Sequence, residues 1–349
     1  MSDLPRILQA QIASEGPISV ASYMQTCLTH PTHGYYVTRD PLGTGGDFTT
    51  APEVSQMFGE MVGLWLAQVW MDQGQPDCIL AELGPGRGTL MADILRVTKA
   101  VPGFHAAIQV WLVEASPVLR AAQSAALPDA TPNWAGSVAE LPDTLPLFVV
   151  ANEFYDALPI RQFVRRGAEW AERMIGYSDE LHFGLAPPVA MQALDQRFPD
   201  VAEGTIVETA APGEAAAASL AQSIADRGGA ALYIDYGDWE GTGDTFQALE
   251  AHKYVDPLAH PGLADLTAHV GFRWLAEASA PLRPAFTSQG AFLERLGVTA
   301  RAEALAKSGD YQAVADQHRR LTHPDEMGKL FKVLALTRSD APPSPGFET

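Results

Sequence analysis

The middle of the chain alternates between apolar runs and stretches with helical spacing. Runs that fit buried strands occur at 78–83, 108–114, 147–151 and 230–237. Apolar residues at helical spacing follow the first run from Thr89 and the second run from Ser116-Pro117. A chain that alternates strand, helix and strand is typical of a doubly wound parallel sheet. We therefore predict an α/β fold.

Segments outside this alternation predict additions to the sheet. Residues 1–30 look helical with a break at Gly16-Pro17, and residues 160–187 alternate as a β-hairpin. Residues 328–337 read as a last strand, and the Pro- and Ser-rich tail after it is expected to be flexible. The expected parts are an N-terminal helical and lid region at 1–75, a core at 76–159 and 204–240 completed by 327–338, a substrate lobe made of a hairpin insertion at 160–203 and helices at 241–326, and a tail at 339–349.

Composition narrows the class of protein. With 349 residues, 47% of them hydrophobic, the chain can bury a large core. Its 42 acidic residues outnumber 23 basic ones, and the formal charge of −19 argues against DNA or RNA as the partner, since nucleic-acid binding normally needs a basic face. No apolar run approaches the roughly 18 residues of a membrane span. The N-terminus shows no targeting signal, so the cytoplasm is the expected compartment.

Cysteine and histidine positions do not predict a metal site. Two cysteines are too few for a disulfide framework. Cys27, His30 and His33 are spaced like metal ligands, but no second cluster completes such a site. Pro31 and Gly34 fit the end of a helix followed by a turn, so we expect no metal.

The segment with the clearest chemistry is Glu82-Leu83-Gly84-Pro85-Gly86-Arg87-Gly88, between the first strand and its helix. Glycine at 84, 86 and 88 lets a ligand lie against bare backbone, and the helix start offers unpaired N–H groups. Three ligands compete for such a turn: a dinucleotide, a nucleotide phosphate and S-adenosylmethionine.

The residues of the turn favour the third ligand. A dinucleotide fingerprint requires G-x-G-x-x-G and a P-loop requires Lys followed by Ser or Thr, and neither is present. Glu82 would repel a pyrophosphate but suits the ammonium group of a methionine moiety. A lone glycine-rich turn is a weak signal, so an anion-binding turn or a purely structural turn stays open.

Polar residues end the neighbouring strands as well. Glu114 closes the second strand, where its carboxylate can accept hydrogen bonds from both ribose hydroxyls of an adenosine, although a solvated acid is the alternative. Ser137 and Val138 follow a short third strand, at a position where they would line an adenine ring. Asn152 and Glu153 end the fourth strand. Ligands of open α/β sheets bind at the carboxyl ends of strands, so these positions favour an adenosine ligand.

A glycine-rich loop at 43–55 precedes an apolar helix and carries Gly46, Asp47 and Thr50. A lid that closes over a ligand and a plain loop with a helix cap both fit this pattern.

Several segments together resemble one family, the MidA-like class I S-adenosylmethionine-dependent methyltransferases. The matching segments are 16–20, 30–36, 46–56, 82–91, 152–163, 234–237, 265–270, 289–293 and 327–337. The resemblance implies a Rossmann-like methyltransferase sheet with helical and hairpin insertions that form a substrate lobe. It also implies S-adenosylmethionine as the cofactor. The mitochondrial members are arginine methyltransferases that assist assembly of respiratory complex I, so the resemblance implies a protein-arginine methyltransferase.

The resemblance and the strand-end residues together give an expected site. Expected cofactor contacts are Glu82, Gly84, Gly86, Gly88, Glu114, Ser137, Val138, Asn152, Gly46 and Thr50. An arginine acceptor needs carboxylates that orient its guanidinium and accept a proton, for which Glu153 and Asp156 are the hypothesis and Asp47 and His269 the lesser alternatives. His269 also fits a hydrogen-bonded loop histidine.

The acceptor itself rests on the resemblance alone. The expected partner is a protein substrate, a complex I-type dehydrogenase subunit in the cytoplasm, with a homodimer left open. A small-molecule or carboxyl methyltransferase, and a non-catalytic assembly factor that binds the cofactor, remain alternatives.

Overall fold

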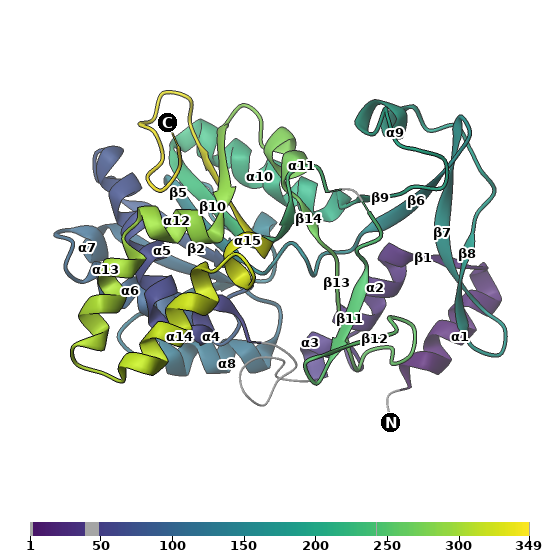
Figure 1. Ribbon diagram of the computed structural model, residues 1–349, viewed down its shortest axis with the longest axis horizontal. Helices are drawn as coiled ribbons and strands as arrows, with labels where there is room; N and C mark the ends of the chain where they lie inside the picture. The colour runs from purple at the N-terminus through teal and green to yellow at the C-terminus, as the bar shows by residue number, and fades with distance from the viewer. Residues whose placement is uncertain (1–2, 39–48, 242, 349) are drawn as a thin grey trace. The chain divides into compact units, whose positions relative to one another are not determined.

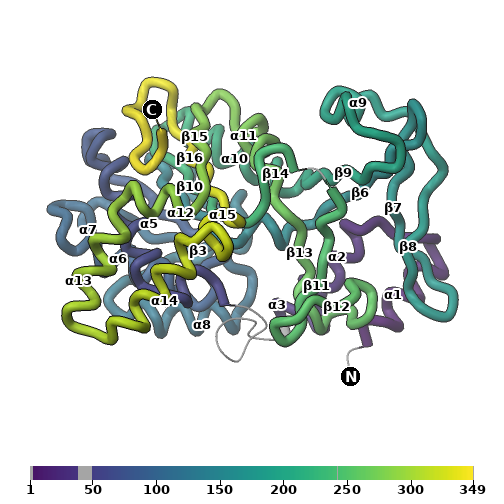
Figure 2. Tube along the Cα trace, viewed as in Figure 1, coloured from purple at the N-terminus to yellow at the C-terminus, as the bar shows by residue number. Residues whose placement is uncertain are grey.

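The computed structural model describes residues 3–38, 49–241 and 243–348 and divides into two compact units (Figure 1). Unit 1 comprises Met1–Phe48, Asp156–Glu214 and Trp239–Gly271. Unit 2 comprises Thr49–Tyr155, Ala215–Asp238 and Phe272–Thr349. The chain therefore passes from one unit to the other several times (Figure 2).

Unit 2 is built on a mixed sheet in the order β15-β16-β10-β5-β2-β3-β4. Its strands are β2 (Cys78–Leu83), β3 (Ile108–Val113), β4 (Asn133–Ala135), β5 (Leu147–Asn152), β10 (Gly229–Asp238), β15 (Arg283–Ser288) and β16 (Phe331–Thr337). The five strands from β4 to β10 run parallel, whereas β16 is antiparallel to both β10 and β15. All six residues of β2 and of β5 are buried, as expected for central strands with both faces covered.

Helices supply the rest of unit 2. They are α4 (Ala51–Val54), α5 (Gln56–Asp72), α6 (Thr89–Thr98), α7 (Phe104–Ala107), α8 (Pro117–Ala126), α11 (Phe272–Ala278), α12 (Gln289–Arg295), α13 (Val298–Ala306), α14 (Tyr311–Thr322) and α15 (Met327–Leu330), with the 3-10 turn η1 (Val138–Glu140). Helix α10 (Ala211–Arg227) begins in unit 1 and continues in unit 2.

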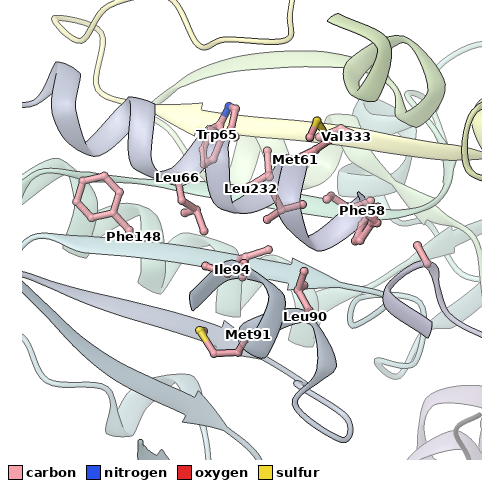
Figure 3. Close-up of a cluster of buried hydrophobic side chains, with 14 of the residues drawn as sticks. Phe58, Met61, Trp65, Leu66, Leu90, Met91, Ile94, Phe148, Leu232 and Val333 are labelled. Atoms are coloured by element: carbon pink, nitrogen blue, oxygen red, sulfur yellow. The ribbon is translucent and has the colours of Figure 1, made fainter. Parts of the chain in front are cut away.

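The core of unit 2 lies between helices α5 and α6 and one face of the sheet (Figure 3). Side chains of α5 and α6 pack there against side chains of β5, β10 and β16. Residues labelled in Figure 3 are Phe58, Met61, Trp65, Leu66, Leu90, Met91, Ile94, Phe148, Leu232 and Val333. This packing fixes α6, and with it the turn that joins β2 to α6.

Unit 1 combines short helices with two antiparallel sheets. Its elements are α1 (Leu4–Glu15), β1 (Ile18–Ser19), α2 (Val20–Thr29), α3 (Tyr35–Thr38), β6 (Arg161–Arg166), β7 (Glu169–Tyr177), β8 (Leu181–Leu185), α9 (Gln192–Arg197), β9 (Ile206–Thr209), β11 (Gln247–Glu250), β12 (Lys253–Val255), β13 (Asp265–Thr267) and β14 (Val270–Gly271). One sheet has the order β1-β7-β6-β9 with β8 beside β7, and the other the order β12-β11-β13. A separate hydrophobic core fills this unit.

The predicted α/β sheet and its last strand are confirmed, and so is the hairpin that forms β6 and β7. The last strand, β16, runs antiparallel to β10. The last strand begins at Phe331, because residues 327–330 form helix α15. The segment 241–326, expected to be a helical lobe, includes strands β11 to β15, and its residues from Phe272 onward belong to unit 2. Within the described part of the chain, no helix is both long and apolar enough to cross a membrane.

Residues 339–348, for which the composition predicted flexibility, make specific contacts within unit 2. The Trp65 indole N–H donates to Ser344 Oγ (3.1 Å), and the rings of Phe292 and Phe347 lie 5.4 Å apart. Arg283 donates to the carbonyl oxygen of Ala341 (2.8 Å). The few aromatic and polar partners in this segment anchor it, although Pro and Ser dominate its composition.

Candidate functional site

A tight turn follows β2 and leads into α6. Gly84, Gly86 and Gly88 have φ angles of 59°, 53° and 88°, in the left-handed region that side chains rarely adopt. A Cβ atom on Gly84 would lie 3.0 Å from Cδ2 of Phe154. The Gly84 N–H donates to the carbonyl oxygen of Val113 (3.1 Å), which ties the turn to β3. The turn therefore presents bare backbone beside the first turn of a helix, where N–H groups lack intrahelical partners.

Glu82 stands at the carboxyl end of β2, two residues before this turn. Its side chain is 3% exposed, and its Oε2 atom has no hydrogen-bond partner among the described residues. Burial raises the pKa of Glu82 to about 8, although a hydrogen bond from the Met91 backbone N–H works in the opposite direction. A buried acceptor with no partner is costly to the fold, so this position favours a ligand that donates to it.

Two polar side chains from neighbouring strands share one face of the sheet with Glu82. The core residues Leu80, Leu112 and Val150 all belong to the cluster beneath α5 and α6. Glu82, Glu114 and Asn152 each follow one of them by two residues, and side chains alternate between the two faces of a strand. The three polar groups therefore extend from the same face at the carboxyl ends of β2, β3 and β5.

Glu114 is held by several hydrogen bonds at the end of β3. Its Oε1 accepts from the Ser116 backbone N–H (2.7 Å), and its Oε2 accepts from Gln123 Nε2 (3.4 Å). The Arg120 guanidinium donates to its carbonyl oxygen through Nε (2.8 Å) and Nη2 (2.5 Å). Burial raises the pKa of Glu114, and the hydrogen bonds from Ser116 and Gln123 oppose that effect. The carboxylate is thus fixed in one orientation.

Asn152 and Glu153 form a tight turn at the end of β5. Glu153 has a φ of 51°, uncommon for a residue with a side chain. Its Oε1 accepts from the Ala51 N–H (3.1 Å) and from Asn152 Nδ2 (3.2 Å), while its own N–H donates to the Ile234 carbonyl oxygen (2.9 Å). The buried Oδ1 of Asn152 has no partner among the described residues. Strained backbone held by several contacts is typical of functional sites.

Asp235 fixes the residues that follow this turn. It is fully buried in β10, and its Oδ2 accepts from the backbone N–H groups of Phe154 (3.2 Å) and Tyr155 (3.0 Å). Its Oδ1 accepts from the Tyr236 N–H (2.9 Å). This carboxylate therefore anchors the backbone next to Glu153.

Once Glu82 is ionised, the unpartnered oxygen atoms of Glu82 and Asn152 are both acceptors. Glu82 Oε2 and Asn152 Oδ1 both call for a ligand with N–H or O–H groups, such as an ammonium group. A phosphate would offer neither oxygen a donor. This edge therefore suits a positively charged, donor-bearing ligand, with bare glycine backbone beside it.

Comparison with known proteins identifies the family. The model of a family described as S-adenosyl-L-methionine-dependent methyltransferases matches residues 61–285. The chain belongs to this methyltransferase family. Among curated relatives, the Danio rerio protein named "Protein arginine methyltransferase NDUFAF7, mitochondrial" is 36% identical over 94% of this chain and 85% of its own length. The Homo sapiens protein of the same name is 36% identical over 95% of this chain and 82% of its own length.

Solved structures agree with this methyltransferase assignment. A crystal structure from Burkholderia thailandensis bound to S-adenosyl-homocysteine has a TM-score of 0.84 and 29% identity, and the match covers 99% of this chain and 92% of that one. A native crystal structure from the same organism has a TM-score of 0.83 and 29% identity, with coverage of 99% and 94%. The protein is thus an enzyme, and its cofactor is S-adenosyl-L-methionine.

Most of the site residues expected from the sequence lie at the carboxyl edge of the methyltransferase sheet in unit 2. They are Glu82, Gly84, Gly86, Gly88, Glu114, Ser137, Val138, Asn152 and Glu153, with Thr50 next to the Ala51 that bonds Glu153. Asp156 and His269 belong to unit 1. Gly46 and Asp47 lie outside the described residues.

The two residues in unit 1 have different surroundings. The Asp156 carbonyl oxygen accepts from the Ala268 N–H (3.0 Å), and the His269 N–H donates to Thr245 Oγ1 (2.9 Å). Tyr36 donates to Asp265 Oδ1 (2.8 Å), and burial together with the charges of Asp265 and Asp156 raises the pKa of Tyr36. Asp156 is therefore close enough to Tyr36 to act on it electrostatically.

The sequence reasoning missed two buried residues, Gln123 and Asp235. Gln123 could have been suspected, because it lies one helical turn after Leu119 on the buried face of α8, where a polar side chain needs a partner. Asp235 interrupts the buried run of β10 in the same way. Neither pattern identifies all the partners, because Gly86 lies 37 positions from Gln123, and Phe154 lies 81 positions from Asp235.

Proposed function

We propose that this methyltransferase acts on the guanidinium group of an arginine side chain in a partner protein. The observation that carries this proposal is the 34–36% identity, over 94–97% of the chain, to relatives named protein arginine methyltransferase. The carboxylate of Glu153 at the carboxyl end of β5 supports it, because a guanidinium is a cation with five N–H donors.

We propose contacts for each part of the cofactor. Glu82 and Asn152 accept hydrogen bonds from the ammonium group of the methionine moiety, because each has a buried oxygen without a partner among the described residues. Glu114 accepts from the ribose hydroxyls, and Ser137 and Val138 line the adenine. The backbone of Gly84, Gly86 and Gly88 lies against the cofactor, and Thr50 contributes a further contact from the residue before α4. Gly46, also expected as a contact from the sequence, lies outside the described residues.

Catalysis in this scheme rests mainly on positioning. When bound, S-adenosyl-L-methionine supplies a methyl group on a positively charged sulfur and leaves as S-adenosyl-homocysteine. The protein must hold the acceptor nitrogen in line with the bond that breaks, at roughly 3 to 3.5 Å, and exclude water. The nitrogen that gains the methyl group gives up a proton, so a nearby carboxylate assists the reaction.

We assign the orienting carboxylate to Glu153. Bonds from Ala51, from Asn152 and to Ile234 fix its backbone and one carboxylate oxygen, so a guanidinium would meet a preorganised partner. Asp156 is the second candidate, since it follows the same turn along the chain. Asp47 and His269 remain lesser candidates.

A labelled-methyl transfer assay tests the function. Lysate from a strain lacking the protein is incubated with S-adenosyl-L-methionine labelled in its methyl group and with purified enzyme, and the labelled band is hydrolysed to amino acids. We expect methylarginine with the wild type and with Glu303→Gln, a control at an exposed carboxylate of α13. We expect transfer to fall about a hundredfold with Glu153→Gln, while affinity for S-adenosyl-homocysteine stays within about threefold of the wild type.

Each other outcome of this assay has a separate meaning. Wild-type transfer by Glu153→Gln would refute the role of that residue and leave the acceptor intact. Label released by mild base would indicate a carboxyl methyl ester, and label only in small molecules would indicate a metabolite acceptor. Tight cofactor binding without any labelled product would favour a non-catalytic assembly factor.

We also propose that the acceptor is a complex I-type dehydrogenase subunit, which rests on the family resemblance of the sequence. The cytoplasmic compartment expected from the sequence stays a prediction. The relatives compared above are named as mitochondrial proteins. A homodimer stays equally open. Labelling of purified dehydrogenase subunits in the same assay tests the partner, and sedimentation of the purified enzyme tests the assembly.

A further inference from the structure

Gln123 connects three elements that surround the proposed adenosine site. It is fully buried in α8 and makes side-chain bonds to three other segments. Its Nε2 donates to the Gly86 carbonyl oxygen (2.8 Å) and to Glu114 Oε2 (3.4 Å). Its Oε1 accepts from the Trp134 indole N–H (2.8 Å), in strand β4. One amide therefore bonds the glycine turn, the acid after β3 and the next strand.

The orientation of this amide is set by its partners. An indole N–H can only donate, so the atom that faces Trp134 must be the amide oxygen. The amide nitrogen then faces Gly86 and Glu114, which both offer oxygen atoms. The opposite orientation would place an N–H against an N–H and an oxygen against two oxygens. Trp134 thus keeps the donor of Gln123 directed at Glu114.

The bonds to Glu114 come from both sides of its carboxylate. The Ser116 backbone N–H binds Oε1, and Gln123 binds Oε2. The bond from Gln123 is long, at 3.4 Å, whereas its bond to Gly86 is short. The same amide therefore fixes the backbone of the glycine turn firmly and orients Glu114 more weakly.

We propose that Gln123 is a positioning residue, which orients Glu114 toward the ribose hydroxyls and holds the glycine turn in register with it. The inference rests on the ribose contact of Glu114 that we proposed above. It predicts that Gln123 affects discrimination between ligands with and without ribose hydroxyls. A merely structural glutamine would weaken all ligands alike or lower only the thermal stability.

The test compares adenosine with 2′-deoxyadenosine as competitors of S-adenosyl-homocysteine. The ratio of their affinities measures the hydroxyl contact, and for the wild type we expect at least about tenfold, as for a hydrogen bond to a charged group. The variants are Gln123→Met, which keeps the size and removes the polar atoms, and Trp134→Phe, which removes only the indole donor. Gln109→Met, at an exposed glutamine of β3, is the matched control.

For Gln123→Met we expect the ratio of the two affinities to fall to about three or less. The ratio should fall less for Trp134→Phe and stay unchanged for Gln109→Met. Glu114→Gln distinguishes the ribose contact of Glu114 from the positioning role of Gln123. If Glu114→Gln keeps the wild-type ratio, the ribose contact is wrong. If it loses the ratio while Gln123→Met and Trp134→Phe keep it, the positioning role is wrong. Should Gln123→Met fail to fold, Trp134→Phe carries the same test.

Discussion

Glu82 gives the sharpest prediction, because cofactor binding should change its protonation. In the ligand-free protein, burial raises its pKa from an ordinary value of 4.5 to about 8. At pH 7 about nine tenths of the molecules then carry a protonated Glu82. An ammonium group beside it favours the ionised form, so binding of S-adenosyl-homocysteine should release about 0.9 proton at pH 7.

The magnitude of the effect on affinity follows from the same pKa. Ionising Glu82 at pH 7 costs about 1.4 kcal/mol, which corresponds to about tenfold weaker binding than at a pH well above the pKa of about 8. Between pH 6 and 7 the affinity should therefore rise about tenfold. The sign for stability is opposite: protonated Glu82 stabilises the ligand-free fold fully below about pH 4.5, and this contribution is lost as the pH rises through about 8.

Calorimetric titration in buffers of different ionisation enthalpy measures the protons released. Adenosine, which lacks the amino-acid moiety, is the control ligand and should release none. Glu82→Gln should also release none, and it corrects for protons exchanged by the ligand itself. Wild-type binding of S-adenosyl-homocysteine that releases no proton and is independent of pH between 6 and 7 would refute the reasoning.

Two further substitutions test the framework of unit 2. Gly84→Ala places a side chain at a φ of 59°, 3.0 Å from the Phe154 ring. We expect the free energy of unfolding, measured by thermal unfolding, to fall by about 1–2 kcal/mol, and S-adenosyl-homocysteine to bind at least about tenfold more weakly. Wild-type stability together with wild-type binding would contradict the role of this turn. Glu60 is 2% exposed and accepts from Arg301 and Arg96; burial works against the charged form, but the two arginines outweigh it and lower the pKa of Glu60. Glu60→Gln should lower the free energy of unfolding in urea at pH 7 by about 1–3 kcal/mol, which is less than for a fully buried pair because both arginines are partly exposed. The difference in stability between wild type and variant should shrink as the pH falls through the lowered pKa of Glu60. Equal stability at pH 7 would argue against this network.

The sequence predicted the parallel strands well, because β2 and β5 are continuous apolar runs whose burial is a local property. It also predicted which residues follow those strands, and parallel strands bring such residues to one edge. The roles of Gln123 and Asp235 could not be predicted, since each depends on partners that only the sheet order brings close. The same holds for Ser344, whose bond to Trp65 spans 279 positions of the sequence.

The most direct measurement of the central claim is site-resolved mass spectrometry of arginine methylation in cells. Proteomes are compared between cells with the wild-type gene, cells without it, and cells that carry Glu153→Gln. We expect at least one methylated arginine peptide that is present with the wild type and absent from the other two. Arginine methylation that is identical in all three, with the cofactor bound by the purified protein, would contradict it.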